Sequence, residues 1–269
     1  MATGFMPGEF FEVVKPLLPE DKPVGASGGR PRVLNEVALR VVWYVLTTGI
    51  RWQDVLQEMG CSGRTAHRRL REWQALGIWE ALHAKLLELL NGEGKLALEI
   101  IVIDSTQVPA PGHGEATGPN PTDRGKSGSK HTLMVDGNGV PLALHTSGSN
   151  SSDQVEIIPI VIEFPKVKGK PGRPKEHPDE AYADRGYDND WTRLLLRWLK
   201  IEPKIAKRRT EHGSGLGTVR WVVERTNAWL KGLRRMRVRW DRLLEVQEAW
   251  NLLAMSVICF RLWSECSMG

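Results

Sequence analysis

The stretch Leu98-Glu-Ile-Ile-Val-Ile103 leads directly into Asp104-Ser-Thr106. A nearly continuous β-branched run of this length is typical of a strand that is buried on both faces of a sheet. A carboxylate that follows such a run is costly to leave without a partner, and cations are suitable partners. We therefore expect Asp104 where its strand gives way to a loop, which is the edge where α/β sheets bind ligands.

The pattern after residue 104 predicts the rest of a sheet domain. Gly137-Asn-Gly139 separates two apolar segments and indicates a β-hairpin. Residues 107–129 are rich in Pro, Gly, Ser and Thr, which predicts a long loop. Strands are expected at 130–136, 140–145, 180–183 and 201–206, and helices at 155–164 (capped by Asp153), 191–199, 220–231 and 243–263. This order describes an α/β (α+β) fold, a mixed sheet with helices on its faces.

The pattern before residue 98 is helical instead. We expect helices at 34–46, 52–59, 63–73 (capped by Ser62) and 79–90, with Gly49 ending the first. Residues 1–32 are rich in Pro and Gly and lack periodicity, which predicts a basic arm. The chain is thus divided into the arm (1–32), an all-helical domain (33–92) and the sheet domain (96–269).

The helical domain carries a candidate DNA-binding surface. Two helices joined by a Gly-containing turn, the second of them basic, match the helix-turn-helix pattern. The second helix would expose Arg64, His67, Arg68 and Arg71, and bury Ala66, Leu70 and Trp73. A three-helix bundle with a solvated basic face is the alternative. Arg30 and Arg32 lie in a Gly-Arg-Pro-Arg arm, which either follows a DNA minor groove or is a solvated linker.

Composition sets limits on these interpretations. The net charge is +5 and the pI is about 9.2, which permits a polyanionic partner. No apolar run is long enough to span a membrane, and no secretory signal is recognisable. The three cysteines form no C-x-x-C pair, which favours a reducing cytosol and no structural zinc. We therefore expect a cytoplasmic, nucleoid-associated protein.

Two further acids extend the site of Asp104. Asp184 follows the strand at 180–183, and Glu224 lies on a helical stripe with Arg220, Asn227 and Lys231. Three carboxylates in basic surroundings suit two Mg²⁺ or Mn²⁺ ions that act on a phosphodiester. The alternatives are turn chemistry at the aspartates and an exposed ion pair on the helix.

The three acidic motifs resemble, in order, those of the DDE transposases of bacterial insertion sequences, in the IS4/IS5 group. The first is Asp104-Ser-Thr106, the second Asp184-Arg-Gly-Tyr-Asp188, and the third Arg220-x₃-Glu224-x₆-Lys231. Thr48-Gly-Ile-Arg-Trp52 and Arg69-Leu-Arg-Glu-Trp73 are similar to the helical domain that precedes such nucleases. Gly217 departs from the pattern, which often has Tyr there, and the short spacing from Asp184 to Glu224 leaves no room for an insertion domain.

The resemblance implies an RNase H-like catalytic domain that holds two metal ions through Asp104, Asp184 and Glu224. It implies cleavage of double-stranded DNA at the ends of the element and transfer of the freed 3′-hydroxyls to target DNA, without a nucleotide triphosphate. A homodimer or larger assembly on DNA is expected. The phosphate and DNA contacts would come from Arg220, Asn227, Lys231, Lys126, Lys130, Arg185, Arg208 and Arg209, together with the helical-domain and arm residues named above.

Three alternatives stay open from the sequence. The chain could be a helix-turn-helix regulator whose RNase H-like half serves only as a scaffold. It could also be a structure-specific nuclease that cuts DNA without joining it. The apolar run 250–263 is either core or a dimer surface.

Overall fold

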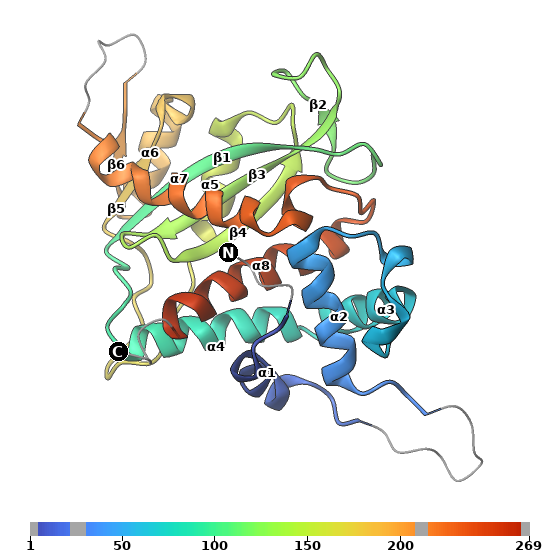
Figure 1. Cartoon of the computed structure of the whole chain (residues 1–269). Coiled ribbons are helices and arrows are strands. Elements are labelled where there is room, and N and C mark those ends of the chain that lie inside the picture. The colour runs from blue at the N-terminus through green and yellow to red at the C-terminus, as the bar shows by residue number, and fades with distance from the viewer. Residues whose placement is uncertain (1–4, 22–30, 208–214, 265–269) are drawn as a thin grey trace.

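The computed structural model describes residues 5–21, 31–207 and 215–264 (Figure 1). Arg30, Arg208 and Arg209, which we expect to contact DNA, lie outside these ranges. The described part consists of a helical region, a sheet with its own helices, and a long helix between the two. Among the described residues, no helix combines the length and apolar character needed to cross a membrane.

The N-terminal segment differs from the predicted arm. Residues 8–17 form a helix, α1 (Gly8–Val14), and a 3₁₀ turn, η1 (Lys15–Leu17). Phe10 is fully buried, and its ring lies 4.9 Å from that of Trp43 and 5.2 Å from that of Phe260. This segment is therefore part of the core. The sequence did not indicate a helix because a seven-residue helix shows little periodicity.

The remaining helices of this region follow the prediction except at one segment. They are α2 (Asn35–Thr48), α3 (Gly63–Ala75) and α4 (Ile78–Gly92). Gly49 ends α2 in the left-handed conformation, and the Ser62 side chain caps α3 by accepting from Thr65 N. The predicted helix at 52–59 is instead two 3₁₀ turns, η2 (Trp52–Asp54) and η3 (Gln57–Met59), because the backbone between them is extended. The predicted helix-turn-helix pair of helices 52–59 and 63–73 is therefore wrong, since the helix before α3 is α2 and residues 49–62, not a tight turn, join the two.

The sheet has six strands: β1 (Ile100–Pro109), β2 (Gly118–Pro119), β3 (Ser127–Asp136), β4 (Pro141–Gly148), β5 (Glu180–Ala183) and β6 (Glu202–Ile205). β1 pairs with β3 antiparallel and with β5 parallel. β4 extends the antiparallel side beyond β3, and β6 extends the parallel side beyond β5. β3 pairs antiparallel with both β1 and β4, whereas β5 and β6 run parallel to β1, which lies between β3 and β5. This is the strand order of an RNase H-like sheet. The predicted fold class is confirmed.

The helices of the sheet region are α5 (Asp153–Ile162), α6 (Asp190–Trp198) and α7 (Gly217–Gly232), with 3₁₀ turns η4 (Arg185–Tyr187) and η5 (Arg234–Arg237). α7 packs on β1 and β3 and crosses in front of the sheet in Figure 1. The predicted cap of α5 is wrong: Ser152 occupies the N-cap position, and the carboxylate of Asp153 pairs with Lys130 instead.

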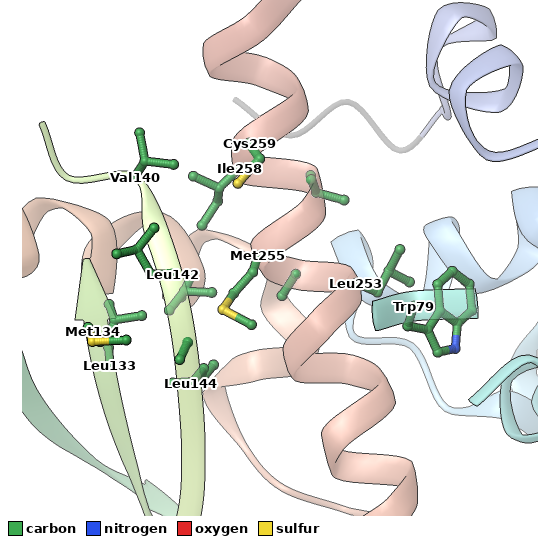
Figure 2. Close-up of a cluster of buried hydrophobic side chains, with 14 of the residues drawn as sticks. Trp79, Leu133, Met134, Val140, Leu142, Leu144, Leu253, Met255, Ile258 and Cys259 are labelled. Carbon is green, nitrogen blue, oxygen red and sulfur yellow. The ribbon is translucent and has the colours of Figure 1, made fainter. Parts of the chain in front are cut away.

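α8 (Leu244–Ser264) joins the sheet to the helical region. Met255, Ile258 and Cys259 point toward the strand β4, while Leu253 points toward Trp79 of α4 (Figure 2). All five side chains are almost completely buried. The predicted alternative between core and dimer surface is thus resolved for most of the apolar run, which is core.

Replacing Phe10 by alanine tests the correction to the predicted arm. Loss of a fully buried aromatic side chain should lower the free energy of unfolding by about 3–5 kcal/mol, measured by urea denaturation. Phe5, which is 87% exposed, is the matched control, and Phe5→Ala should change stability by no more than about 0.5 kcal/mol. Equal effects of the two substitutions would contradict the packing of α1 against α2 and α8.

Candidate active site

Asp104 lies within β1 and not at its end. The strand continues to Pro109 because its antiparallel partner β3 extends alongside it, and Asp104 is paired with Leu133. The parallel partner β5 is shorter: Ile100, Ile101 and Val102 pair with residues 180–182. Continuing this register places Asp104 level with Asp184, the first residue after β5. Because neighbouring strands lie about 4.8 Å apart, equal register brings the two carboxylates onto adjacent positions.

The charge of Asp104 is poorly compensated. Its side chain is 22% exposed, and Oδ1 lies 3.9 Å from the guanidinium of Arg220. Asn227 Nδ2 donates a hydrogen bond of 3.1 Å to Oδ2. Burial raises the pKa of Asp104 to about 6, against the attraction of Arg220, and the charges of Asp184 and Glu224 raise it further. The site therefore disfavours an uncompensated negative charge on Asp104.

α7 carries the third acid over the sheet. Arg220 and Asn227 both reach Asp104, and Glu224 lies between them on the same helical stripe. Glu224 is exposed, whereas Asn227 is 7% exposed. Lys231, one turn further along, is exposed, and burial, Arg239 and Lys231 together lower the pKa of His131. The stripe expected from the sequence therefore faces Asp104.

Polar contacts hold α7 against the β3–β4 turn. Thr226 Oγ1 donates to the Gly139 carbonyl at 2.6 Å, and Arg225 Nη2 donates to the Asn138 carbonyl at 2.5 Å. Gly139 has φ of +84°, and a Cβ there would lie 2.5 Å from Arg225 Nη2. The turn must therefore carry glycine at this position for α7 to approach.

Four residues of the segment 184–188 have a defined local structural role. The Asp184 carboxylate caps η4 by accepting from Gly186 N at 2.7 Å. A Cβ on Gly186 would lie 2.7 Å from Asp153 Oδ2 and 2.9 Å from Asp184 Oδ1, so that position has to be small. Tyr187 is buried, and its hydroxyl shares a 2.5 Å hydrogen bond with Ser105 Oγ. Asp188 accepts from Arg193, which also donates to the carbonyl that ends β6.

The Ser105–Tyr187 contact ties the first acidic motif to the second. Ser105 Oγ also lies 3.0 Å from Thr132 Oγ1 of β3. The bridge links the residue after Asp104 to the turn after Asp184, and it thereby fixes the two backbones relative to each other. The sequence did not indicate this role, because a serine in a strand and a tyrosine in a turn carry no pairing signal.

The residues at the site fit a hard cation. Asp104 and Asp184 offer carboxylate oxygens, the ligands that Mg²⁺ and Mn²⁺ prefer. Asn227 Oδ1 is buried and has no hydrogen-bond partner in the described structure. Within that same part of the chain, however, no group of three or more His, Cys, Asp or Glu side chains is already assembled around a metal position. Asp104 and Asp184 thus lie level with each other on neighbouring strands, and Glu224 on α7 lies too far from them to complete a preformed metal site.

The other predicted DNA contacts separate into internal and external groups. Lys130 is 5% exposed, and its ammonium donates to the Ser151 carbonyl and, at 2.8 Å, to Asp153. These contacts pair its charge inside the protein. Lys130 therefore does not lie on the surface that we expected to line the DNA path. Asn227 likewise lies buried against Asp104 instead of facing solvent. Lys126 is exposed beside Asp123, and Arg185 is half-buried in η4.

The cations of α3 also differ in their availability. Ala66, Leu70 and Trp73 are buried as expected. Arg71 pairs with Glu245 of α8 at 2.6 Å, and Arg32 pairs with Glu72 at 2.5 Å. His67 is half-buried with its ring 5.2 Å from that of Trp52, and burial lowers the pKa of His67. Arg64 and Arg68 are exposed, and neither forms an ion pair or a hydrogen bond within the described ranges.

A groove of about 1160 Å³ adjoins Arg64. Its walls come from η2, from the first turn of α3 and from the segment after η5, and include Arg51, Arg64 and the half-exposed Trp240. The helical region and the sheet region thus meet at a concave, partly basic surface.

Known proteins resemble both parts of the chain. Residues 95–259 match the family described as "Transposase DDE domain", and residues 6–83 match "Putative transposase of IS4/5 family". The "Putative transposase for insertion sequence element IS402" of Burkholderia cepacia is 50% identical over 144 residues, which cover 54% of this chain and 68% of the relative. An uncharacterized 16.2 kDa protein of the same element is 41% identical over 45% of this chain and 84% of its own length.

Solved structures give a weaker likeness. The crystal structure of a pre-cleavage Mos1 transpososome is 12% identical, with a TM-score of 0.34, and covers 92% of this chain and 81% of its own. The Mos1 strand transfer complex is 13% identical, with a TM-score of 0.33 and coverages of 92% and 80%. These values are too low to bear on function, and the strand order defines the fold by itself.

Asp104→Asn tests the desolvation of this carboxylate. Because the pKa rises from 3.8 to about 6 on folding, the folded state holds more protons within that interval, and stability falls as pH rises through it. In the presence of EDTA, the asparagine variant should be more stable than wild type above pH 6 by roughly 1–3 kcal/mol. The difference should vanish toward pH 4.

Urea denaturation at a series of pH values measures this difference. Asp136, another buried acid whose pKa burial raises to about 6, remains in both proteins, so its contribution cancels. A variant that is less stable than wild type at neutral pH would show that Arg220 and Asn227 compensate Asp104 fully.

Proposed function

The chain belongs to the transposase DDE domain family of the IS4/5 type, and from this premise we propose that it cuts DNA at the ends of its element and joins them to target DNA. The observation that carries the proposal is the level placement of Asp104 and Asp184 beneath the Arg220–Glu224–Asn227 stripe of α7. In a mixed sheet, this edge is where ligands bind.

Asp104 and Asp184 would hold divalent metal ions, with Glu224 of α7 as the third carboxylate of the site. Bound Mg²⁺ or Mn²⁺, two ions per site, would neutralise phosphate charge and raise the nucleophilicity of the attacking oxygen. Asn227 holds Asp104 in orientation through its Nδ2–H. Arg220, whose guanidinium lies 3.9 Å from Asp104, would donate to a phosphate oxygen beside that carboxylate.

The proposed reaction has two steps at the same site. In the first, the oxygen of water forms a bond to the scissile phosphorus, and the bond from phosphorus to the 3′-oxygen breaks, which leaves a 3′-hydroxyl. In the second, that 3′-oxygen attacks a phosphodiester of target DNA and displaces the target's own 3′-oxygen. The second step exchanges one phosphodiester for another, so it requires no nucleotide triphosphate.

Binding of double-stranded DNA would rest on the exposed cations. Arg64 and Arg68 extend from α3 near the groove, and Lys231 and Lys126 are exposed in the sheet region. Phosphate contacts of this kind supply affinity and position the duplex. The substrate would be the terminal repeats and the target site, bound by a homodimer or larger assembly in the bacterial cytoplasm, in association with the nucleoid.

Cleavage by wild type and by Asp184→Ala tests the proposed chemistry. Purified protein is incubated with duplexes that carry the terminal sequences of the element, with Mg²⁺, Mn²⁺ or EDTA. We expect metal-dependent nicks that leave 3′-hydroxyls, followed by products joined to target DNA, and at least a 100-fold loss in the alanine variant.

The matched control is Asp179→Asn, because Asp179 is an exposed carboxylate that pairs with Lys175 at the other end of β5. It should cleave like wild type. Cleavage without joining would indicate a nuclease. Metal-independent binding without cleavage by any of these proteins would indicate a regulator instead.

The salt dependence of DNA binding tests α3. Arg64→Ala and Arg68→Ala should each weaken binding and reduce the slope of log K against log salt concentration by about 0.9. Arg32→Ala should change the slope less, because Arg32 already pairs with Glu72. Fluorescence anisotropy over a salt series measures this, and equal slopes for all four proteins would exclude Arg64 and Arg68 as phosphate contacts.

A further inference from the structure

α6 presents an apolar stripe to solvent. Trp191 is 63% exposed, Leu194 58% and Trp198 78%. At about 100° per residue these three side chains fall within about 60° of one another on the helix. The opposite face, with Thr192 and Leu196, is almost completely buried. α6 therefore buries one face against the core and exposes an apolar stripe on the other.

This stripe is separate from the site described above. α6 lies beside β6, at the far end of the molecule from α2 and α3 (Figure 1). Arg193 ties α6 to its neighbours by donating both to Asp188 and to the carbonyl of Ile205. The stripe consists of large, exposed aromatic side chains and a leucine, and aromatic residues are enriched at the centres of interfaces.

We propose that the outer face of α6 is the contact surface for a second copy of this chain, with the two α6 helices antiparallel across a twofold axis. In an isologous contact between antiparallel helices, each residue of one copy faces the residue of the other copy that lies at an equal distance along the sequence on the other side of the twofold axis. Trp191 and Trp198 are equidistant from a point next to Leu194. An axis at Leu194 therefore brings Trp191 of each copy against Trp198 of the other, with Leu194 packed at the centre.

The charges beside the stripe fit the same arrangement. Asp190 and Arg197 lie on one flank, close together on the helical wheel, and both are exposed. Their midpoint lies between Arg193 and Leu194, one residue from the midpoint of the two tryptophans, so the antiparallel pairing places Asp190 near Arg197 of the second copy. Arg197 makes a loose 3.6 Å contact with the exposed Glu202, which leaves it able to turn toward a partner. A parallel pairing would instead place like charges together.

The available area indicates a weak dimer in the absence of DNA. Two tryptophans and a leucine at these exposures supply on the order of 400 Å² of apolar surface. A stable dimer buries about 800 Å² on each partner. Val155 of α5 is 65% exposed, and Gln154 beside it accepts a hydrogen bond from Asn189 at the start of α6, so α5 extends the same surface. We expect dissociation in the micromolar range.

Sedimentation equilibrium of the full chain without DNA tests the proposal over the micromolar range. Wild type should dimerise, and Leu194→Glu should weaken the dimer roughly 10-fold or more. Leu76→Glu is the matched control, because Leu76 is 57% exposed and lies at the end of α3. It should dimerise like wild type. Circular dichroism checks that both variants are folded.

A charge exchange tests the antiparallel geometry. Asp190→Arg alone and Arg197→Asp alone should each weaken the dimer, because each places like charges opposite one another across the axis. The double variant should recover most of the lost affinity. A wild type that stays monomeric, a Leu194→Glu protein that dimerises normally, or a double variant without recovery would each overturn the proposal. None of these outcomes depends on the DNA chemistry.

Discussion

Asp104 is a buried carboxylate within a central strand, and the rest of the site depends on how far hydrogen bonds and nearby cations compensate its negative charge. Asp136, at the far end of β3, provides the comparison. Both are buried, and burial raises the pKa of each to about 6. Asp136 accepts hydrogen bonds from three backbone amides, which saturate its oxygens and fix the hairpin turn. Asp104 accepts from the Asn227 side chain and from the Ser105 backbone amide, and a guanidinium lies 3.9 Å away, which leaves lone pairs on its oxygens able to bind a cation.

The placement of α7 depends on that same turn. Asp136 fixes the turn, Gly139 leaves space for Arg225, and Thr226 anchors the helix to the turn carbonyl. These contacts set the rotation of α7 about its axis. With the rotation fixed, the stripe that carries Arg220, Glu224 and Asn227 faces β1. A hairpin loop that lies outside the site therefore determines where its third acid and its cations lie.

The sequence predicts elements well where periodicity is strong and neighbours are local. It predicts β5, α6, α7 and the stripe on α7, because each depends on spacing along a single segment. It does not predict that β1 continues past Asp104, because the continuation depends on pairing with β3. The burial of Lys130 depends on Asp153, and the Ser105–Tyr187 bridge joins β1 to the turn η4. The sequence therefore identifies the candidate acids but cannot give the register that aligns Asp104 with Asp184, or the contacts that orient them.

The energetic cost of Asp104, together with the open lone pairs on its oxygens, favours a catalytic sheet over a scaffold. A protein that used this fold only to dimerise or to display α3 would be more stable with a neutral side chain at this position. The desolvation is incurred beside Asp184 and Glu224, whose charges increase it, and beside an Asn227 Oδ1 atom without a partner in the described structure. Local destabilisation of this kind persists where a ligand relieves it. A divalent cation would reverse the sign of all three acidic interactions at once, so the arrangement that is unfavourable without metal favours the enzyme over the regulator.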